Sequence, residues 1–262
     1  MVLKTMLRVM LKTMKRAAGL AGLVLMASEA LASGGPPMLT DDTGTPGDGH
    51  WEINTAVLTD RVAGATTYQL PLLDLNYGIG ERAQIKFEMP WLYQHGPDGE
   101  SRSGAGNSLM GVRWRFYDAG ENAWQVSTYP QVQFNFPGAD SAHNGLAESG
   151  NSYLLPFEFV HGFGNFDVNF EAGRWFRPSS QQDTWIAGAV LTREVKKGVE
   201  LMLELHDEVA VQSSAHELIV NVGGRWDFSP RYTLLVAAGR DVHNSLGNTD
   251  SLLTYLGVQM RY

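Results

Sequence analysis

The chain has 262 residues, of which 44% are hydrophobic and 18% charged, a composition that is typical of folded proteins and excludes wholesale disorder. The formal net charge of -8 and the pI near 5.3 exclude the clustered basic surface of a nucleic-acid-binding protein. Cysteine is absent, which excludes disulfides, thiolate nucleophiles and cysteine-ligated metals.

The first 32 residues have the pattern of a secretory signal peptide. Lys12, Lys15 and Arg16 precede the apolar run "AAGLAGLVLMA", and Ala30-Leu31-Ala32 offers a cleavage site near Ala32/Ser33. The run is shorter than the roughly 20 residues of a membrane-spanning helix. We therefore expect residues 1–32 to be removed on export, with Met1 or Met14 as the start of translation; the product carries 15 basic and 27 acidic residues.

Residues 33–49 form a Gly/Pro-rich segment, "SGGPPMLTDDTGTPGDG", which we expect on the periplasmic side. It either hangs free in the periplasm or folds into the interior of the sheet structure that follows. The spacing of Asp41, Thr43, Thr45 and Glu52 is faintly similar to a calcium loop. Because Pro46 replaces the glycine such a loop requires, we predict no metal site.

Residues 50–262 break into short alternating segments separated by Gly, Asp, Asn, Ser and Pro clusters, and no helical period is evident. We count twelve predicted strands: 51–58, 68–77, 83–92, 108–117, 124–136, 152–160, 166–176, 184–192, 199–207, 217–227, 232–240 and 252–262. Roughly ten residues at about 3.3 Å each, tilted near 45°, cover an apolar band about 25 Å tall.

The two faces of these strands differ in polarity. Lys86 and Glu88 alternate with Ile85, Phe87 and Met89, for example. The connections alternate between brief turns such as "GIGER" and longer loops such as "PGADSAHNGLAESGN", which is typical of outer-membrane barrels. We predict an all-β, closed antiparallel transmembrane barrel of about twelve strands, with a soluble β-barrel or sandwich as the alternative.

An even strand count places both chain ends in the periplasm, with the last strand closing against the first. The tryptophans lie near predicted strand ends, where amphipathic rings favour the membrane-water interfaces. We expect Trp51, Trp114, Trp124 and Trp226 on the periplasmic side and Trp91, Trp175 and Trp185 on the outer side.

Three prolines interrupt predicted strands: Pro71, Pro130 and Pro156. A closed barrel has no free edge where a missing N–H is harmless, so we predict β-bulges at these positions. At Pro71 the apolar phase slips by one residue, as a bulge requires.

Charged residues of the non-lipid phase are the candidate lumen-lining groups. The predicted set is Asp74, Lys86, Glu88, Arg113, Arg115, Glu158, Glu171, Glu204, Arg225 and Arg261, with Asp167, His206 and Asp227 in the same phase. They indicate either a polar path that selects solutes by charge and size or a salt-bridged filling of a narrow barrel. A barrel of about eight strands is filled by its own side chains, whereas one of about sixteen or more strands contains an aqueous channel. A barrel of twelve strands lies between these two sizes.

Several phrases resemble the outer-membrane barrel family labelled for the meta-pathway of phenol degradation: "DDTGTPGDGHWEIN", "LPLLDLNYGIGERAQIKFEMPWL", "GNSLMGVRWRFYD" and "YPQVQFNFP". The closing "YLGVQMRY" is similar to the assembly signal of outer-membrane proteins. The resemblance implies a barrel that transports aromatic or other hydrophobic compounds, and it brings no catalytic residues.

We therefore expect a passive outer-membrane channel for small solutes, with membrane lipid and the assembly machinery as further partners and no cofactor. A non-conducting structural or surface-binding barrel is the first alternative. A lipid hydrolase is the second, with Ser141 and His143 in a predicted outer loop; His161 and His206 are equally compatible with turn or lumen positions.

Overall fold

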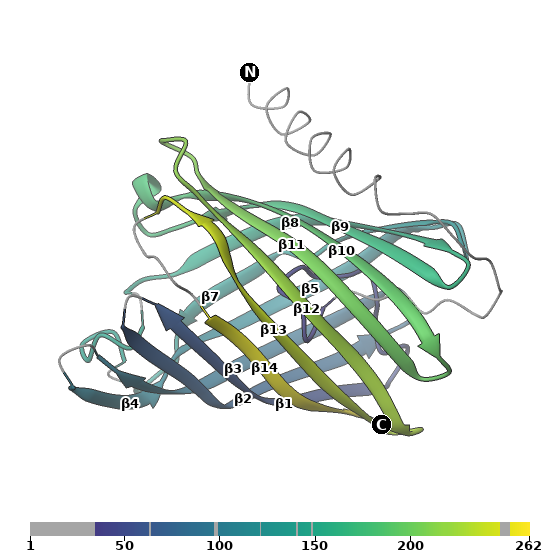
Figure 1. Ribbon diagram of the computed structural model, residues 1–262, viewed down its shortest axis with the longest axis horizontal. Helices are drawn as coiled ribbons and strands as arrows, with labels where there is room; N and C mark the ends of the chain where they lie inside the picture. Colours follow the sequence, from purple (N-terminus) through teal and green to yellow (C-terminus); the bar gives the residue numbers. More distant parts are fainter. Residues whose placement is uncertain are drawn as a thin grey trace.

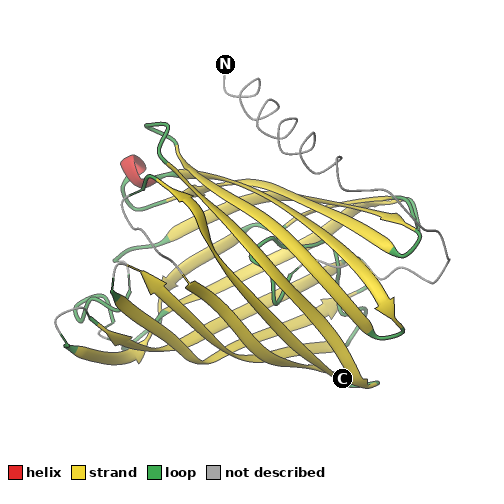
Figure 2. Cartoon of the chain, in the orientation of Figure 1, coloured by secondary structure: helices red, strands yellow, loops and turns green. Residues whose placement is uncertain are grey.

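The computed structural model describes residues 35–62, 64–96, 99–120, 122–139, 141–147, 149–246 and 252–262. The predicted signal peptide lies outside these residues. Strands make up almost all of the regular structure (Figure 2), with one short 3-10 helix, η1 (Ser180–Gln182). The strand segments are β1 (Trp51–Val62), β2 (Ala65–Ile79), β3 (Ala83–His95), β4 (Ser101–Ala105), β5 (Asn107–Asp118), β6 (Trp124–Thr128), β7 (Gln131–Asn135), β8 (Ser152–Phe163), β9 (Phe166–Phe176), β10 (Thr184–Lys196), β11 (Val199–Ala210), β12 (His216–Ser229), β13 (Tyr232–Asn244) and β14 (Leu252–Arg261).

These segments form one closed antiparallel barrel of twelve strands, as predicted. β4 and β5 both pair with β3 and are separated only by Gly106, so together they form one strand. β6 and β7 likewise form one strand between β5 and β8. The barrel closes because β14 pairs with β1 from Arg261↔Glu52 to Leu252↔Arg61.

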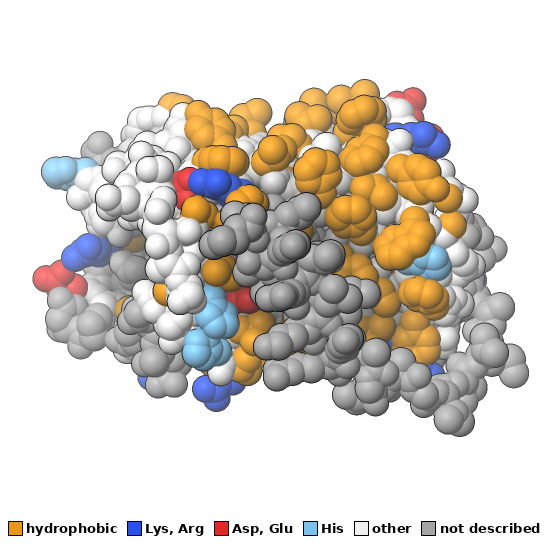
Figure 3. All heavy atoms as spheres, turned by 90° about the horizontal axis from the view of Figure 1, so that it is seen from above, with side chains coloured by type: hydrophobic (Ala, Val, Ile, Leu, Met, Phe, Trp, Pro, Cys, Tyr) orange, Lys and Arg blue, Asp and Glu red, His pale blue; other side chains and the backbone are white. Residues whose placement is uncertain are grey.

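The distribution of side chains is the reverse of that in a soluble protein. Buried polar and charged side chains outnumber buried apolar ones by about two to one, while large apolar side chains such as Val112, Leu201 and Leu256 are exposed. Figure 3 shows hydrophobic side chains gathered over the barrel wall. This reversal is the pattern of a barrel whose outer surface faces lipid.

The two ends of the barrel differ in their connections (Figure 1). The end that carries the C-terminus, here the terminus end, has short turns, including two-residue turns at Gly164-Asn165 and Lys197-Gly198 where glycine takes a positive φ. The opposite end, the loop end, carries longer connections such as residues 136–151. The connection between the strands predicted at 83–92 and 108–117 is shorter than that spacing implies, because β3 continues to His95 and β4 begins at Ser101.

The three prolines are accommodated differently. At Pro71 one extra residue separates the pairs Ala56↔Leu72 and Leu58↔Gln69, which confirms the predicted bulge. Bulges predicted at Pro130 and Pro156 are wrong. Pro130 instead divides β6 from β7 with no extra residue, and Pro156 pairs in register with Gly173. Because Pro130 has no N–H, the ladder of interstrand hydrogen bonds is interrupted there. The Pro130 carbonyl still accepts from the Val112 N–H at 3.1 Å.

No helix in the described part of the chain is long and apolar enough to cross a membrane.

Candidate functional site

Residues 35–47, here the N-terminal segment, lie inside the barrel. They form no strand, and the purple trace in Figure 1 runs behind the front strands. Thr40 and Thr43 are fully buried. The Gly/Pro-rich stretch was expected either free in the periplasm or inside the barrel, and residues 35–47 lie inside.

Side chains of the wall supply the hydrogen bonds that this irregular backbone needs. The Glu204 carboxylate accepts from the Leu39 N–H at 3.1 Å, the Thr40 N–H at 2.6 Å and the Asn221 amide at 2.6 Å. Glu171 accepts from the Asp41 N–H at 2.9 Å. Hydrogen bonds to a charged acceptor are stronger than neutral ones, so Glu204 holds the segment although no cation among the described residues is paired with it.

Arg113 on β5 makes the main ionic contact to the segment. Its guanidinium bridges Asp41 and Asp42, with 3.0 Å to Asp42 Oδ1, and donates to the Gly44 carbonyl at 2.8 Å. Its other face lies 4.4 Å from the centre of the Tyr129 ring. Because both partners are withdrawn from water, removing one leaves an uncompensated charge, at a cost of about 3–5 kcal/mol.

A second charged network lies on β1, β2 and β3. Lys86 Nζ is 3.6 Å from Asp74 and 3.1 Å from Glu88. Asp74 also accepts from the amides of Asn54 and Asn76, each at 3.0 Å. The charges of this network are paired with one another within the wall, so they fix the side chains rather than standing free in the lumen.

The remaining predicted lumen residues are spread along the interior. Near the terminus end, Arg225 donates to the Pro36 carbonyl at 2.8 Å, Arg261 lies 3.4 Å from Asp227, and Arg115 donates to the Glu81 carbonyl at 2.8 Å. Glu158 is fully buried and accepts from Ser127; His206 lies 3.4 Å from the Thr40 hydroxyl. Asp167 is buried.

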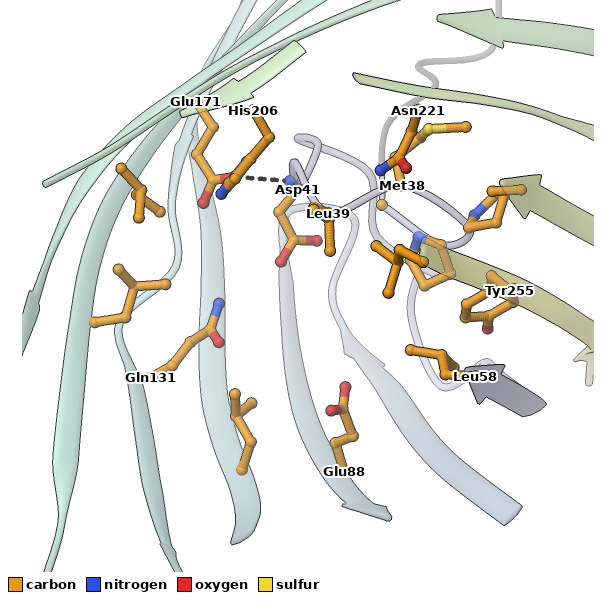
Figure 4. A pocket seen from close by; sticks show the side chains of 18 of the residues that line it. Met38, Leu39, Asp41, Leu58, Glu88, Gln131, Glu171, His206, Asn221 and Tyr255 are labelled. Atoms are coloured by element: carbon orange, nitrogen blue, oxygen red, sulfur yellow. Dashed lines mark hydrogen bonds between the residues drawn. The ribbon is translucent and has the colours of Figure 1, made fainter. Parts of the chain in front are cut away.

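A cavity of about 270 Å³ lies between the N-terminal segment and the loop end (Figure 4). Its walls are partly polar, with Glu88, Glu171 and His206, and it reaches Asp41 of the segment. The larger part of the lining is apolar: Pro36, Pro37, Met38, Leu39, Leu58, Leu109, Leu154, Trp175, Ile186, Ala237, Leu253 and Tyr255. A mixed lining of this kind suits a small ligand with an apolar body and a few polar groups.

The apolar wall of this cavity was not predicted. Leu58 stands in the same phase as Glu52 and Asn54, and Leu253 in the same phase as Gln259 and Arg261. The sequence feature that could have predicted this wall is a leucine at an interior position near the loop end of a strand, where the other interior positions are polar or charged. The predicted lumen-lining set contains only titratable residues and therefore omits these leucines.

Six of the seven tryptophans lie on the outer phase of their strands. Trp51, Trp91, Trp114, Trp124 and Trp226 are exposed, and Trp185 is half-buried beneath the Arg174 guanidinium at 5.2 Å. Trp175 differs from the expectation. It shares the phase of Glu171 and Gly173, lines the cavity and packs on Arg177 at 4.8 Å.

The residues considered for a lipid hydrolase and for a calcium loop do not come together in a site. Ser141 is buried, while His143 lines an open hollow with Arg102 at the loop end; the hydrogen bonds of the described residues include none between the Ser141 and His143 side chains. Thr43 donates to Gln125 at 2.8 Å and Thr45 to the Glu81 carbonyl at 3.0 Å. Within the described ranges no cluster of three acidic or histidine side chains is placed to hold a metal ion.

The sequence matches no protein-family model and no curated protein. Solved structures do share its fold. The COG4313 outer membrane channel from Pseudomonas putida F1 superposes with a TM-score of 0.66 at 16% identity, covering 84% of this chain and 98% of that one.

Two further barrels are similar over most of the chain. The NanC porin superposes with a TM-score of 0.58 at 7% identity, covering 79% of this chain and 98% of its own. The KdgM porin, solved with disordered oligogalacturonate, gives a TM-score of 0.55 at 9% identity, covering 80% and 98%. At these identities the likeness establishes the shared barrel fold.

Proposed function

We propose that this protein is a channel of the bacterial outer membrane for small solutes with a substantial apolar part. The observation that carries the proposal is the cavity inside a lipid-facing barrel, lined by Leu58, Leu109 and Leu253 as well as by Glu88 and Glu171. A barrel that served only as a scaffold would need no apolar hollow in an otherwise polar interior.

In this arrangement the loop end faces outward and the terminus end faces the periplasm, as short turns on one side and long loops on the other favour. A solute enters at the loop end and reaches the cavity. The N-terminal segment stands between the cavity and the terminus end, held by Arg113, Glu204 and Arg225. Passage into the periplasm then requires this segment to move or to leave a narrow path.

The apolar lining supports hydrophobic or aromatic solutes, the class implied by the resemblance to the phenol meta-pathway barrels. The mechanism is passive diffusion, and we propose no cofactor or catalytic group. The structural neighbours whose printed names are channels or porins have the same barrel fold, which supports transport without identifying a solute.

Planar-bilayer recording tests the proposal. The protein beginning at Ser33 is compared with a variant that lacks residues 35–47. We expect small current steps from the first and several-fold larger steps from the second, because removing the segment opens the terminus half of the lumen.

Heat-modifiable gel mobility must show that both proteins are folded. Two folded but silent proteins would contradict a channel and would favour the alternative of a barrel that acts through its outer loops.

A further inference from the structure

Two arginines interrupt the lipid-facing surface of the barrel at the loop end. Arg61 on β1 and Arg240 on β13 belong to the outer phase of their strands, and both side chains are exposed. Their chain neighbours Asp60 and Asp241 point into the barrel, because successive side chains of a strand lie on opposite faces. Alternation therefore places these cations on the outer wall and these anions in the lumen.

The strand register brings the two arginines into one row. Leu252 on β14 pairs with Arg61 on one side. On the other side the β13–β14 ladder runs to Gly239↔Leu253, so Arg240 is the next residue and stands opposite Leu252. Two strand spacings, about 10 Å, separate the backbones of the two arginines. Their side chains are long enough for both guanidiniums to contact one ligand above Leu252.

The two guanidiniums have few contacts within the protein. In the described part of the chain Arg61 has no hydrogen bond or ion pair, and Arg240 donates only from Nε, to the Asp241 carbonyl at 3.3 Å. Asp207, an acidic side chain of the outer phase on β11, is bonded to His216 Nδ1 at 2.9 Å. A charge on a lipid-facing wall is costly unless it is paired or reaches the headgroup layer. An anion that pairs with these arginines therefore comes from the surroundings of the barrel.

The row lies just beyond the aromatic side chains of the loop end. Tyr68 on β2 pairs with Thr59, which is one outer position closer to the middle of β1 than Arg61. Tyr68 also pairs with Tyr93 on β3, and both tyrosines are exposed. Aromatic girdles of this kind mark the membrane-water interface. The arginines stand about 7 Å farther out along the strands, at the depth of lipid headgroups.

The outer wall below the row is apolar. Leu256 pairs with Val57 on β1 and with Val236 on β13, and the side chains of Leu256 and Val236 are 56% and 40% exposed. Leu252, in the row itself, is 47% exposed. An acyl chain can therefore lie along β14 while its headgroup stays beside the arginines.

We infer that Arg61 and Arg240 form a binding site for a lipid of the outer leaflet that carries phosphate on its headgroup. Guanidiniums bind phosphate through paired, charge-assisted hydrogen bonds, and the acyl chains lie on Leu252 and Leu256. The phosphorylated glycolipid of bacterial outer membranes, anchored by lipid A, has this chemistry. The inference concerns the outer wall, goes beyond the proposed channel function and holds whether or not the lumen conducts.

Native mass spectrometry of the purified protein in detergent tests the site by titration with lipid A and with lipid A from which both phosphates have been removed. We expect the unaltered protein to bind lipid A roughly 30-fold more tightly, the product of two arginine–phosphate contacts of roughly 5.5-fold each. The double variant Arg61→Gln, Arg240→Gln should bind the two lipids equally. Inorganic phosphate at the same concentration should not displace lipid A, because it lacks the acyl chains that contact the wall.

The matched control is the double variant Arg193→Gln, Arg231→Gln, which removes two positive charges at the terminus end. Arg193 also lies on the outer phase, 5.0 Å from the centre of the Phe166 ring, and Arg231 is exposed in the turn between β12 and β13. Heat-modifiable gel mobility must show that both double variants are folded. The control should keep the preference for the phosphorylated lipid.

Three results would overturn the site. They are an equal loss of the preference in both double variants, no preference in the unaltered protein, and displacement of lipid A by inorganic phosphate at the same concentration. Because binding is measured in detergent, none of these results depends on whether the barrel conducts, and the planar-bilayer test of the channel stands apart from this one.

Discussion

Arg113 shows how single residues join the N-terminal segment to the wall. Its guanidinium reaches Asp41, Asp42 and the Gly44 carbonyl from the interior of β5. We expect Arg113→Gln to leave both carboxylates buried without their cation and to release the segment. A loss of about 3 kcal/mol would raise the open fraction about a hundredfold.

Single-channel open probability measures this effect. Arg102→Gln is the control, because Arg102 pairs with Glu100 at the surface, with side chains 49% and 65% exposed, and such pairs contribute little. An open probability that is the same in both variants would mean that Arg113 does not hold the segment.

At the scale of elements, a strand glycine lets the N-terminal segment approach the wall. A Cβ added at Gly188 on β10 would stand 2.1 Å from the Thr40 hydroxyl. Gly188→Ala should therefore displace the segment and raise the open probability, while the barrel still forms. Gly104→Ala on β4 is the control, because its nearest neighbour is the flexible end of Leu146 at 3.1 Å.

The loop between β9 and β10 depends on Asp183. Hydrogen bonds from the Arg174 guanidinium and the Arg177 N–H lower the pKa of this carboxyl. Because the folded-state pKa is lowered, the ionised carboxylate stabilises the loop at every pH above the unfolded-state pKa of about 3.9. This stabilisation is lost as the pH falls through the folded-state pKa. We expect pepsin to cleave residues 177–183 only below about pH 4.

The Asp183→Asn variant checks the cause of this loop stability. It removes the charged acceptor, so a protease active at neutral pH should already cut the loop at pH 7. Resistance equal to that of the unaltered protein would show that the loop is held by other contacts.

For the whole molecule, the interior carries more acidic than basic side chains. Toward the loop end, Asp60, Glu208, Glu217 and Asp241 influence one another electrostatically, and Arg177 lies 3.4 Å from Glu208. A low-dielectric wall focuses this field on the entrance. We expect the channel to favour cations, with a reversal potential in a salt gradient that moves toward zero in the double variant Asp60→Asn, Glu217→Gln.

The control is Asp48→Asn at an exposed residue of the terminus end, which removes one negative charge where the double variant removes two. If it changes selectivity as much as the double variant does, selectivity is set by total charge rather than by the loop-end carboxylates.

The amino-acid sequence by itself determined the number of strands, their lipid-facing phase and the closure of β14 on β1, because a period of two residues is a local property of the chain. It also located the bulge at Pro71, where the phase slip is visible along the chain. It did not locate the break at Pro130, since whether a missing N–H produces a bulge or a gap depends on the neighbouring strands.

Only the tertiary structure decided what the lumen contains. The contacts of Arg113 with Asp41, and of Glu204 with Thr40, join residues far apart in the chain, and no periodicity encodes them. The same holds for Trp175, Leu58 and Leu253, which line one cavity from three different strands. Alternation tells which side chains point inward, but which of them meet depends on barrel closure and on where the N-terminal segment lies.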